Sequence, residues 1–404
     1  STKENAAASI AAIGFALTAY LVGVERGYLL RGEAVERVLT TLRFFWNSPQ
    51  GEEPDATGYQ GFYYHFLDMK TGRRAHNSEL SIIDTTFLLA GALAAGRYFD
   101  RDIDEEREIR TLADALYARA DWQWAQNGGP KVSHGWKPGT GFLKYRWEGY
   151  SEALILYVLG LGSPTHSLPA ESYAAWAESY RWKKLYDIEF LYAGPLFIHQ
   201  LSHVWIDFRG IQDEYMRGKG LDYFENSRRA AYLQQQYAIR NPKQFAGYGE
   251  YTWGITASAG PGPARRKVKG IERRFYDYKA RGIPAGPDDG TLAPWAVVAS
   301  LPFAPELVLP SIKYFDEKFP DLTSEYGFKC SYNPTFSDGT NNRGWISQGY
   351  FGLDQGPIVM MIENYRSELI WRLLRQCPYL QVGLQRAGFN GGWLNLSDKQ
   401  VTGK

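Results

Sequence analysis

Apolar residues recur every three to four positions over long stretches of the chain, and segments rich in Gly, Pro and aromatic residues separate these stretches. The spacing matches the 3.6-residue turn of an α-helix and predicts helices with a buried face. Start signals support several of them, such as Ser81 at the third helix and Pro169 and Pro305 at first-turn positions. The predicted helices lie near residues 5–26, 30–47, 80–97, 101–125, 151–160, 169–182, 195–206, 220–239, 290–300, 304–318, 354–364 and 367–376.

The connections between these helices alternate in length. Links from odd to even helices are short, whereas links from even to odd helices are long. In an array of antiparallel helices every second connection lies at the same end, so the long loops should gather on one face. The pattern predicts an all-α fold in which a single domain, residues 1–404, forms an (α/α)6 barrel of six helical hairpins. We expect the odd helices to form the inner ring. The rim loops, with some short β-strands, are predicted at 48–79, 127–150, 183–194, 240–289 and 319–353.

The first predicted helix contains an uncharged stretch from Ala6 to Val24 that is long enough for a membrane span. Eleven of these 19 residues are Ala, Gly, Ser or Thr, however, and such residues insert poorly into lipid. We therefore expect a close-packed buried helix and no membrane insertion.

Composition narrows the classes of function. The 45 Lys and Arg residues balance 44 Asp and Glu residues, which excludes a nucleic-acid binder that relies on a large positive field. Aromatic residues make up 15% of the chain, and their flat apolar faces suit stacking on sugars. The two cysteines, Cys330 and Cys377, are too few for a disulfide scaffold, although one bridge between them stays open.

Acidic residues cluster at the predicted starts of odd helices, where all of them would face the loop-bearing rim. These acids are Glu79, Asp84, Glu152, Asp288, Asp289 and Asp354. Glycoside hydrolysis needs two carboxyl groups, one to protonate the leaving oxygen and one to activate water or attack the anomeric carbon. A first-turn acid can also simply cap a helix, which is the alternative for each residue taken singly. The convergence of several loops on one face favours the catalytic interpretation.

Other chemistries receive less support from the sequence. His199 and His203 are four residues apart, with Asp207 one turn further, which permits a metal site. Residue 200 is Gln rather than the Glu of a His-Glu-x-x-His motif, so buried, hydrogen-bonded histidines are the favoured alternative. The chain has no Gly-x-Ser-x-Gly nucleophile motif. We predict neither a metal nor another cofactor.

Several motifs together resemble the bacterial glucoamylase-like family, and within it the endo-β-1,2-glucanases of glycoside hydrolase family 144. The resemblance spans nearly the whole chain and implies an (α/α)6 barrel, β-1,2-glucan as the substrate, no cofactor, and a periplasmic or secreted enzyme. The motifs are Gly61-Phe62-Tyr63-Tyr64-His65-Phe66-Leu67-Asp68, Asn77-Ser78-Glu79-Leu80-Ser81, Tyr150-Ser151-Glu152-Ala153, Gly162-Ser163-Pro164-Thr165-His166, His203-Val204-Trp205-Ile206-Asp207-Phe208-Arg209-Gly210 and Asp354-Gln355-Gly356-Pro357.

The resemblance suggests Glu152 as the general acid and Asp354 as the candidate base, with Glu79 and Asp84 close by. We expect inverting, endo-acting hydrolysis, for which the two carboxyl groups stand roughly 6.5–9.5 Å apart unless the proton is relayed. Two departures from the family pattern affect glucan chain length and endo versus exo action. Ala259 follows Thr256-Ala257-Ser258 where the family has an acid, and an insertion at 264–281 lengthens a rim loop.

Substrate contacts are expected from rim aromatics and from polar side chains that could bind sugar hydroxyls. Any one of the aromatics could instead belong to the core. The candidate stacking residues are Tyr64, Trp136, Trp147, Trp253, Trp345 and Phe351. The candidate polar contacts are His65, Arg74, His134, Tyr150, Arg343, Gln348 and Gln355.

Three alternative functions remain open at this stage. A retaining transglycosylase would use Glu79 as nucleophile with Glu152 as acid/base. An exo-acting enzyme would release sophorose, a disaccharide. A non-catalytic glucan-binding protein would keep the barrel without the chemistry, and Ala259 favours this more remote alternative.

Overall fold

The computed structural model describes residues 7–336 and 344–395, and an inner ring of six helical segments organises them. Almost every residue of α3 and all of α6 are buried, which explains why their sequences are apolar on all sides. The inner segments are α1 (Ile10–Glu25), α3 (Ile82–Tyr98), α6 (Leu154–Gly162), the paired 3-10 turns η1 (Leu196–His199) and η2 (Leu201–Val204), α10 (Pro294–Val298) and α12 (Gly352–Ser367). All six correspond to odd helices of the predicted series.

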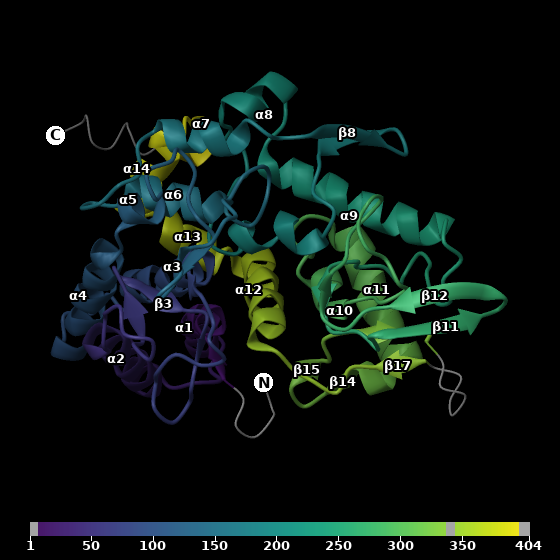
Figure 1. The fold of residues 1–404 in the computed structure, drawn as a ribbon, viewed down its shortest axis with the longest axis horizontal. Coiled ribbons are helices and arrows are strands. Elements are labelled where there is room, and N and C mark those ends of the chain that lie inside the picture. Colours follow the sequence, from purple (N-terminus) through teal and green to yellow (C-terminus); the bar gives the residue numbers. More distant parts are fainter. Residues whose placement is uncertain (1–6, 337–343, 396–404) are drawn as a thin grey trace.

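Packing and hydrogen bonds close these segments into a ring. Helix α1 packs against α3 on one side and α12 on the other, and α3 continues to α6. Ser202 of η2 joins α6, because its Oγ donates to the Glu152 carbonyl and accepts from the Ile155 amide. Gln200 joins α10 by donating to the Ala296 carbonyl at 2.6 Å. Helix α10 then packs against α12, so the circle returns to its start. In Figure 1, α12 lies between the two halves of the molecule.

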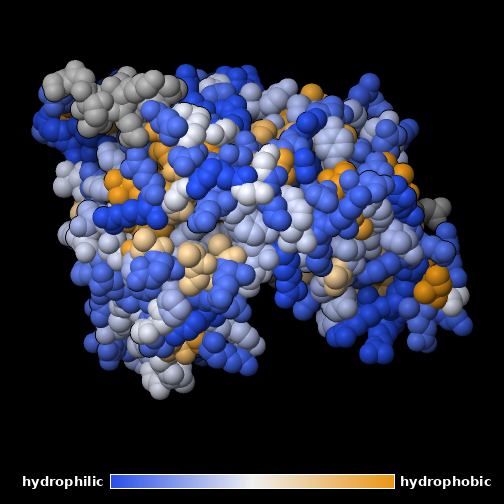
Figure 2. Space-filling view, turned by 90° about the horizontal axis from the view of Figure 1, so that it is seen from above, coloured by the Kyte–Doolittle hydropathy of each residue, from blue (hydrophilic) through white to orange (hydrophobic). Residues whose placement is uncertain are grey.

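Outer helices cover this ring and carry charged residues on their solvent side. They include α2 (Arg31–Asn47), α4 (Asp104–Arg119), α7 (Glu171–Ala177), α9 (Tyr223–Arg240), α11 (Pro305–Lys318), α13 (Leu369–Arg375) and α14 (Pro378–Arg386). Shorter pieces are α5 (Trp122–Ala125), α8 (Glu214–Lys219) and η3 (Pro320–Leu322). The predicted all-α (α/α)6 barrel is therefore confirmed. From above, the surface is mostly hydrophilic, with hydrophobic residues in small separate groups (Figure 2).

The first helix packs unusually close to its neighbour, as its small residues predict. A Cβ on Gly14 would lie 2.2 Å from the Phe87 carbonyl oxygen, and one on Gly91 would lie 2.1 Å from the Gly14 carbonyl oxygen. Only glycine permits this approach of two backbones. Within the described chain, no helix combines the length and the apolar character that crossing a membrane would require.

The rim loops carry short antiparallel strands. A five-stranded sheet has the order β2 (Gly58–Tyr59), β3 (Phe62–Tyr64), β5 (Leu80–Ser81), β6 (Gly135–Lys137), β7 (Gly141–Phe142). Separate pairs join β1 (Ala8–Ser9) with β4 (Phe66–Leu67), β8 (Trp182–Leu185) with β9 (Ile188–Leu191), β10 (Ala257–Ser258) with β13 (Lys279–Ala280), β11 (Ala264–Val268) with β12 (Ile271–Phe275), β14 (Thr323–Ser324) with β15 (Gly327–Phe328), and β16 (Tyr332–Asn333) with β17 (Trp345–Ile346). The β11–β12 hairpin projects from the edge of the molecule (Figure 1).

The helix prediction fails at several places. The helix expected at 195–206 is two 3-10 turns, which meet at Gln200 because its buried side chain turns to bond α10. The helix expected at 169–182 ends at Ala177, and strand β8 begins at Trp182. Helices α8 and α14 were not predicted. Helix α14 packs against the inner helix α6, a long-range contact that local patterning does not reveal.

Candidate active site

A cavity of about 340 Å³ opens at the end of the ring where the inner helices begin. The lining combines carboxyl, imidazole and aromatic groups, which is the mixture of polar and apolar groups expected of a ligand site. The lining residues are His65, Glu79, Ser81, Ile83, Asp84, Phe87, His134, Leu143, Trp147, Glu152, Phe197, Leu201, Ala257, Tyr278, Trp295, Leu353 and Asp354. All four acids predicted as catalytic are among them.

The fold brings these acids together because each stands at the start of an inner helix. Asp84 and Asp354 lie in the first turns of α3 and α12. Glu152 directly precedes Ala153, the N-cap of α6, and Glu79 directly precedes strand β5, which leads into α3. Since the inner helices run in the same direction, their N-terminal ends meet at one end of the ring.

Glu79, His65 and Asp84 form a charged chain along one wall. The Nδ1 atom of His65 lies 2.9 Å from Glu79 Oε1, and its Nε2 atom lies 3.7 Å from Asp84 Oδ2. The hydrogen bond with His65 lowers the pKa of Glu79. Burial opposes the charge on His65, but the bond to Glu79 and the neighbouring carboxylates outweigh it and raise the imidazole pKa. Glu79 is therefore the acid of the cavity that is held anionic.

Asp84 lies deeper in the same wall. Burial raises its pKa, against the opposing effects of the His65 charge and the hydrogen bond with Ser81. The Ser81 hydroxyl donates to Asp84 Oδ2 and also accepts from the Asp84 amide at 3.2 Å, so it caps α3 while holding the carboxyl. Ser81, and not Asp84, is thus the N-cap of α3. The Asp84 carboxyl still faces the cavity.

Glu152 is kept protonated near neutral pH. Burial of its carboxyl raises the pKa to about 7, and the negative charge of Asp84 contributes to the rise. A carboxylic acid that holds its proton at this pH can donate it to a leaving oxygen. Glu152 and Glu79 therefore lie in one cavity with their pKa values moved in opposite directions.

Asp354 is a buried acid with one oxygen left unpaired in the described part of the chain. It is 7% exposed, and its Oδ2 atom has no hydrogen-bond partner among the described residues. Burial raises its pKa to about 7, and the adjacent Cys330 thiol opposes this rise. The Ala259 amide donates to Cys330 Sγ at 3.5 Å. Ala259, which departs from the family pattern, therefore contacts the thiol that lies beside Asp354. Cys330 and Cys377 are both free and buried.

Two of the predicted sugar contacts form a stacked pair on the wall. The rings of His134 and Trp147 are 4.0 Å apart at their centroids and nearly parallel. Burial lowers the His134 pKa, so this imidazole is neutral in the range where Glu152 titrates. Of the predicted substrate-binding residues, His65, His134 and Trp147 line the cavity.

Five predicted contacts lie away from the cavity, in the packed structure. Tyr64 is fully buried beneath the Arg74 guanidinium, which lies 4.7 Å from its ring and donates to the Ser78 carbonyl. Trp253 is also fully buried and donates to Ser311. Trp136 packs on Tyr59 and Trp124, and Tyr150 packs on His199 and Tyr223. These aromatic side chains therefore lie in the core, which was the alternative to a sugar contact.

The remaining predicted contacts belong to the segment before α12 and to the first turn of this helix. Trp345 of β17 pairs with Asn333 of β16, and Gln348 donates to the Ile346 carbonyl. Gln355 donates to the Phe328 carbonyl, and Phe351 is 36% exposed at the start of α12. None of the four lines the cavity. Arg343 lies outside the described residues.

Several lining residues escaped the sequence analysis. Phe87 and Trp295 lie on the inner helices α3 and α10, where core packing was the default expectation. Phe197 lies in η1. Tyr278 lies in the insertion at 264–281, whose length was noticed although no residue in it was singled out.

The other acids and histidines considered from sequence serve the scaffold. Asp288 accepts hydrogen bonds from Tyr237 and Tyr248, and Asp289 forms a buried ion pair with Arg281. His203 bonds Ser227, and burial lowers its pKa to about 3. His199 bonds the Ala193 carbonyl, and burial lowers its pKa to about 4. Among the described residues, no group of three or more His, Cys, Asp and Glu side chains could hold a metal ion.

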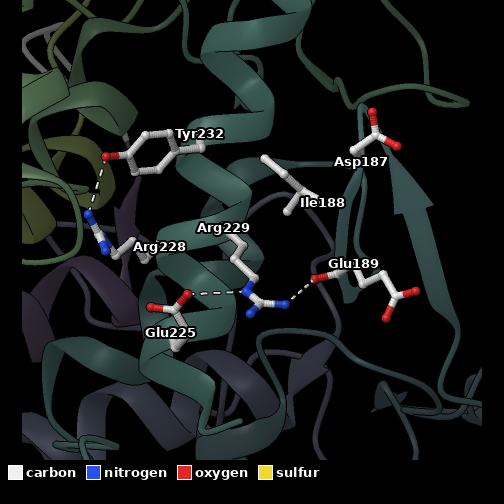
Figure 3. A pocket seen from close by; sticks show the side chains of 7 residues that line it. All are labelled: Asp187, Ile188, Glu189, Glu225, Arg228, Arg229 and Tyr232. Carbon is white, nitrogen blue, oxygen red and sulfur yellow. Dashed lines mark hydrogen bonds and ion pairs between the residues drawn. The ribbon is translucent and has the colours of Figure 1, made fainter. Parts of the chain in front are cut away.

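A larger hollow on the surface has a different character (Figure 3). It measures about 480 Å³ and lies between the β8–β9 hairpin and α9. Its charges are matched within the protein, since Arg229 bonds Glu225 and the Glu189 carbonyl, and Arg228 bonds Glu306. Unmatched carboxyl groups, rather than size, distinguish the cavity at the helix starts.

Known proteins resemble the chain in both sequence and fold. A protein of Bacteroides uniformis has a crystal structure that is 33% identical, covers 98% of this chain and 92% of that chain, and has a TM-score of 0.85. The endo-β-1,2-glucanase of Chitinophaga pinensis, solved with sophorotriose and glucose, is 29% identical over 96% of this chain and 89% of that chain, with a TM-score of 0.84.

A curated relative adds a second activity within the same group. The exo β-1,2-glucooligosaccharide sophorohydrolase (non-reducing end) of Parabacteroides distasonis is 29% identical over 93% of this chain. The chain spans about half of that protein, 52% of its length. The glycoamylase family model, described as "Putative glucoamylase", matches residues 144–378, a stretch that contains both Glu152 and Asp354. Because the family model matches more than half of this chain, the chain belongs to the glycoamylase family.

Proposed function

We propose that the chain is a glycoside hydrolase that cleaves β-1,2-glucan. The observation that carries this proposal is the pairing, in one open cavity, of a carboxyl that keeps its proton near neutral pH with others that can act as base or nucleophile. The relatives supply the substrate, since the Chitinophaga pinensis and Parabacteroides distasonis enzymes are named for β-1,2-linked glucose chains.

Glu152 acts as the general acid in this proposal. Its carboxyl donates a proton to the oxygen of the scissile bond as that bond breaks, which avoids the release of an alkoxide. The raised pKa supports this role, because the proton is present up to about pH 7. Asp84 supports it in turn, since its charge disfavours ionisation of Glu152.

Asp354 acts as the general base and the reaction inverts the anomeric centre. The unpartnered Oδ2 atom supports this role, because it is free to accept a proton from water or from a sugar hydroxyl that relays it. The raised pKa makes Asp354 a stronger base than an ordinary aspartate once it is ionised. Glu79 and His65 bind the sugar, and the His134–Trp147 pair supplies an apolar face.

A retaining transglycosylase is the second candidate, and the state of Glu79 favours it. His65 holds the Glu79 carboxylate anionic within the same cavity as the protonated Glu152, which is the arrangement that a nucleophile and its acid/base partner require. The stereochemistry of the first product separates the two. An α-configured reducing end supports inversion by Asp354, whereas a β-configured one, observed by proton NMR, supports Glu79 as nucleophile.

The direct test is release of reducing ends from linear β-1,2-glucan, with β-1,3-glucan and starch as controls. We expect cleavage of the β-1,2-linked polymer alone. Early products of mixed length indicate the endo action that we propose, whereas sophorose alone indicates exo action. Binding without cleavage would contradict the hydrolase and favour a glucan-binding protein. The periplasmic or secreted location stays a prediction.

A further inference from the structure

Tyr278 belongs to both the surface and the cavity. Its side chain is 65% exposed, yet it lines the same cavity as Glu152 and Asp354. A residue that is open to solvent and also forms a cavity wall stands at the mouth. Phe87 and Trp295, which also line the cavity, are each only 3% exposed, so they form its inner walls.

Tyr278 lines the cavity together with Asp84, Glu152 and Asp354. Desolvation raises the phenol pKa, and the charges of Asp354, Cys330, Asp84 and Glu152 raise it further. Since Coulomb interactions weaken with distance, this influence agrees with the place of Tyr278 in the same cavity lining as the acids. The phenol stays neutral through the pH range in which Glu152 works and can therefore donate a hydrogen bond there.

A buried guanidinium holds the turn that carries Tyr278. Arg281 is fully buried and pairs with Asp289 through contacts of 2.7 and 3.0 Å. It also donates to the carbonyls of Tyr276 and Asp277, while Asp289 accepts from the Tyr276 amide. Charge-assisted bonds of this kind fix backbone geometry tightly. The buried Arg281–Asp289 pair thus fixes the backbone of the turn, although Tyr278 itself is exposed.

The following strand fixes the other side of the turn. Lys279 and Ala280 form β13 and pair with Ser258 and Ala257 of β10. Ala257 itself lines the cavity, and Arg281 also donates to the Ser258 carbonyl at 2.8 Å. Tyr278 is therefore held at a fixed position in the cavity lining, although it belongs to the insertion at 264–281, where it follows the β11–β12 hairpin.

We propose that Tyr278 is a specificity-determining residue that closes the cavity over the sugar next to the scissile bond, with its ring on the sugar face and its hydroxyl donating to a sugar hydroxyl. This inference rests on the proposed β-1,2-glucan hydrolysis. Tyrosine suits both contacts, because it combines an apolar ring with a polar tip. Since it lines the same cavity as Glu152, Asp84 and Asp354, Tyr278 contacts the reacting sugar unit rather than a distant one.

The experiment compares Tyr278→Phe and Tyr278→Ala with the parent on long β-1,2-glucan and on a short β-1,2-linked oligosaccharide. Removing the hydroxyl should lower kcat/KM by about 3- to 10-fold, mainly through KM. Removing the ring as well should lower it by about 30-fold or more. Both factors should be the same for the two substrates, because every productive complex fills the subsite at the cleaved bond.

Tyr276→Phe is the matched control, since Tyr276 lies two residues away and does not line the cavity. We expect parental kinetics from it, and unchanged thermal denaturation for all three variants. Equal kcat/KM for Tyr278→Ala and the parent would overturn the inference, as would a loss confined to the long glucan.

The parent enzyme separates this inference from the proposed function. A parent that cleaves no glucan removes the hydrolase proposal, and glucan binding measured by calorimetry then tests Tyr278 alone. Weaker binding by Tyr278→Ala than by the parent would still support the contact, and equal binding would overturn it.

Discussion

Asp354 and Asp207, two buried carboxyl groups at opposite ends of the inner ring, are treated in opposite ways. Asp354 lies where α12 begins and has no cation beside it, so burial raises its pKa to about 7. Asp207 follows η2 at the other end, where Arg209 and Arg375 bond its carboxylate. Burial acts on Asp207 too, but the bonds with the two guanidinium groups outweigh it and lower the pKa.

The difference shows what burial alone does to an acid. Removing a carboxylate from water is costly, and the protein either supplies a counter-charge or lets the group keep its proton. The Asp207 end supplies the counter-charge, and Glu368 adds a further contact of 2.9 Å with Arg209. No counter-charge is supplied to Asp354, so its pKa stays perturbed, as is common for acids at functional sites.

The largest expected effect is on catalysis at the Asp354 end. Replacing Glu152 with Gln or Asp354 with Asn should lower kcat by about 100- to 10,000-fold, because each change removes a proton donor or acceptor. Reducing-end release at saturating β-1,2-glucan measures the loss. Asp207→Asn is the control and should keep kcat within about twofold of the parent per folded molecule. Activity retained by Glu152→Gln would remove this residue from the mechanism.

The second effect is on folding and should appear at the Asp207 end. Asp207→Asn should lower the free energy of unfolding by about 3 kcal/mol, near the low end for a broken buried ion pair, because both guanidinium groups remain partly exposed. Urea denaturation followed by tryptophan fluorescence measures this change. Glu152→Gln should not be destabilised in the same assay. A larger loss from Glu152→Gln than from Asp207→Asn would contradict the comparison.

The third effect is the pH dependence of stability, which should have opposite signs at the two ends. Asp354 has a folded pKa of about 7 against a usual 3.8, so its contribution to stability is lost as the pH rises through that window. Asp354→Asn should therefore gain stability over the parent by on the order of 2 kcal/mol between pH 5 and pH 8.

Asp207 provides the contrast for this measurement. Its pKa is lowered, so its contribution is present above the usual value of 3.8 and is lost as the pH falls. The deficit of Asp207→Asn should accordingly shrink under acidic conditions. Denaturation at several pH values follows both variants, and parallel curves for the two would refute the opposite assignments.

The smallest effect concerns the Cys330 thiol beside Asp354, the proposed base. The Cys330 side chain lowers the pKa of Asp354, so Cys330→Ala should raise it. Because a general base must be deprotonated, the acidic limb of the kcat profile should then move to higher pH. Cys330→Ser keeps a donor at the same place and should leave the limb near its parental position. A shift to lower pH in Cys330→Ala would contradict this contact.

Much of this architecture could be predicted from sequence because it depends on local periodicity. The apolar spacing and loop lengths indicated the inner helices, and acids at their starts, including Glu152 and Asp354, were expected to share one rim. The break at Gln200 could not be predicted, since it depends on a bond with Ala296 almost one hundred residues away.

The sequence by itself determined the ring of helices and the end at which the acids gather, since both follow from residue spacing along the chain. Only the tertiary structure decided which aromatics reach the cavity at the helix starts, as it places Trp147 on the wall and Trp253 in the core. It alone also decided that Asp207 is paired with arginines and Asp354 is not. The reason is physical: burial and charge compensation arise from contacts between distant segments, which residue spacing does not encode.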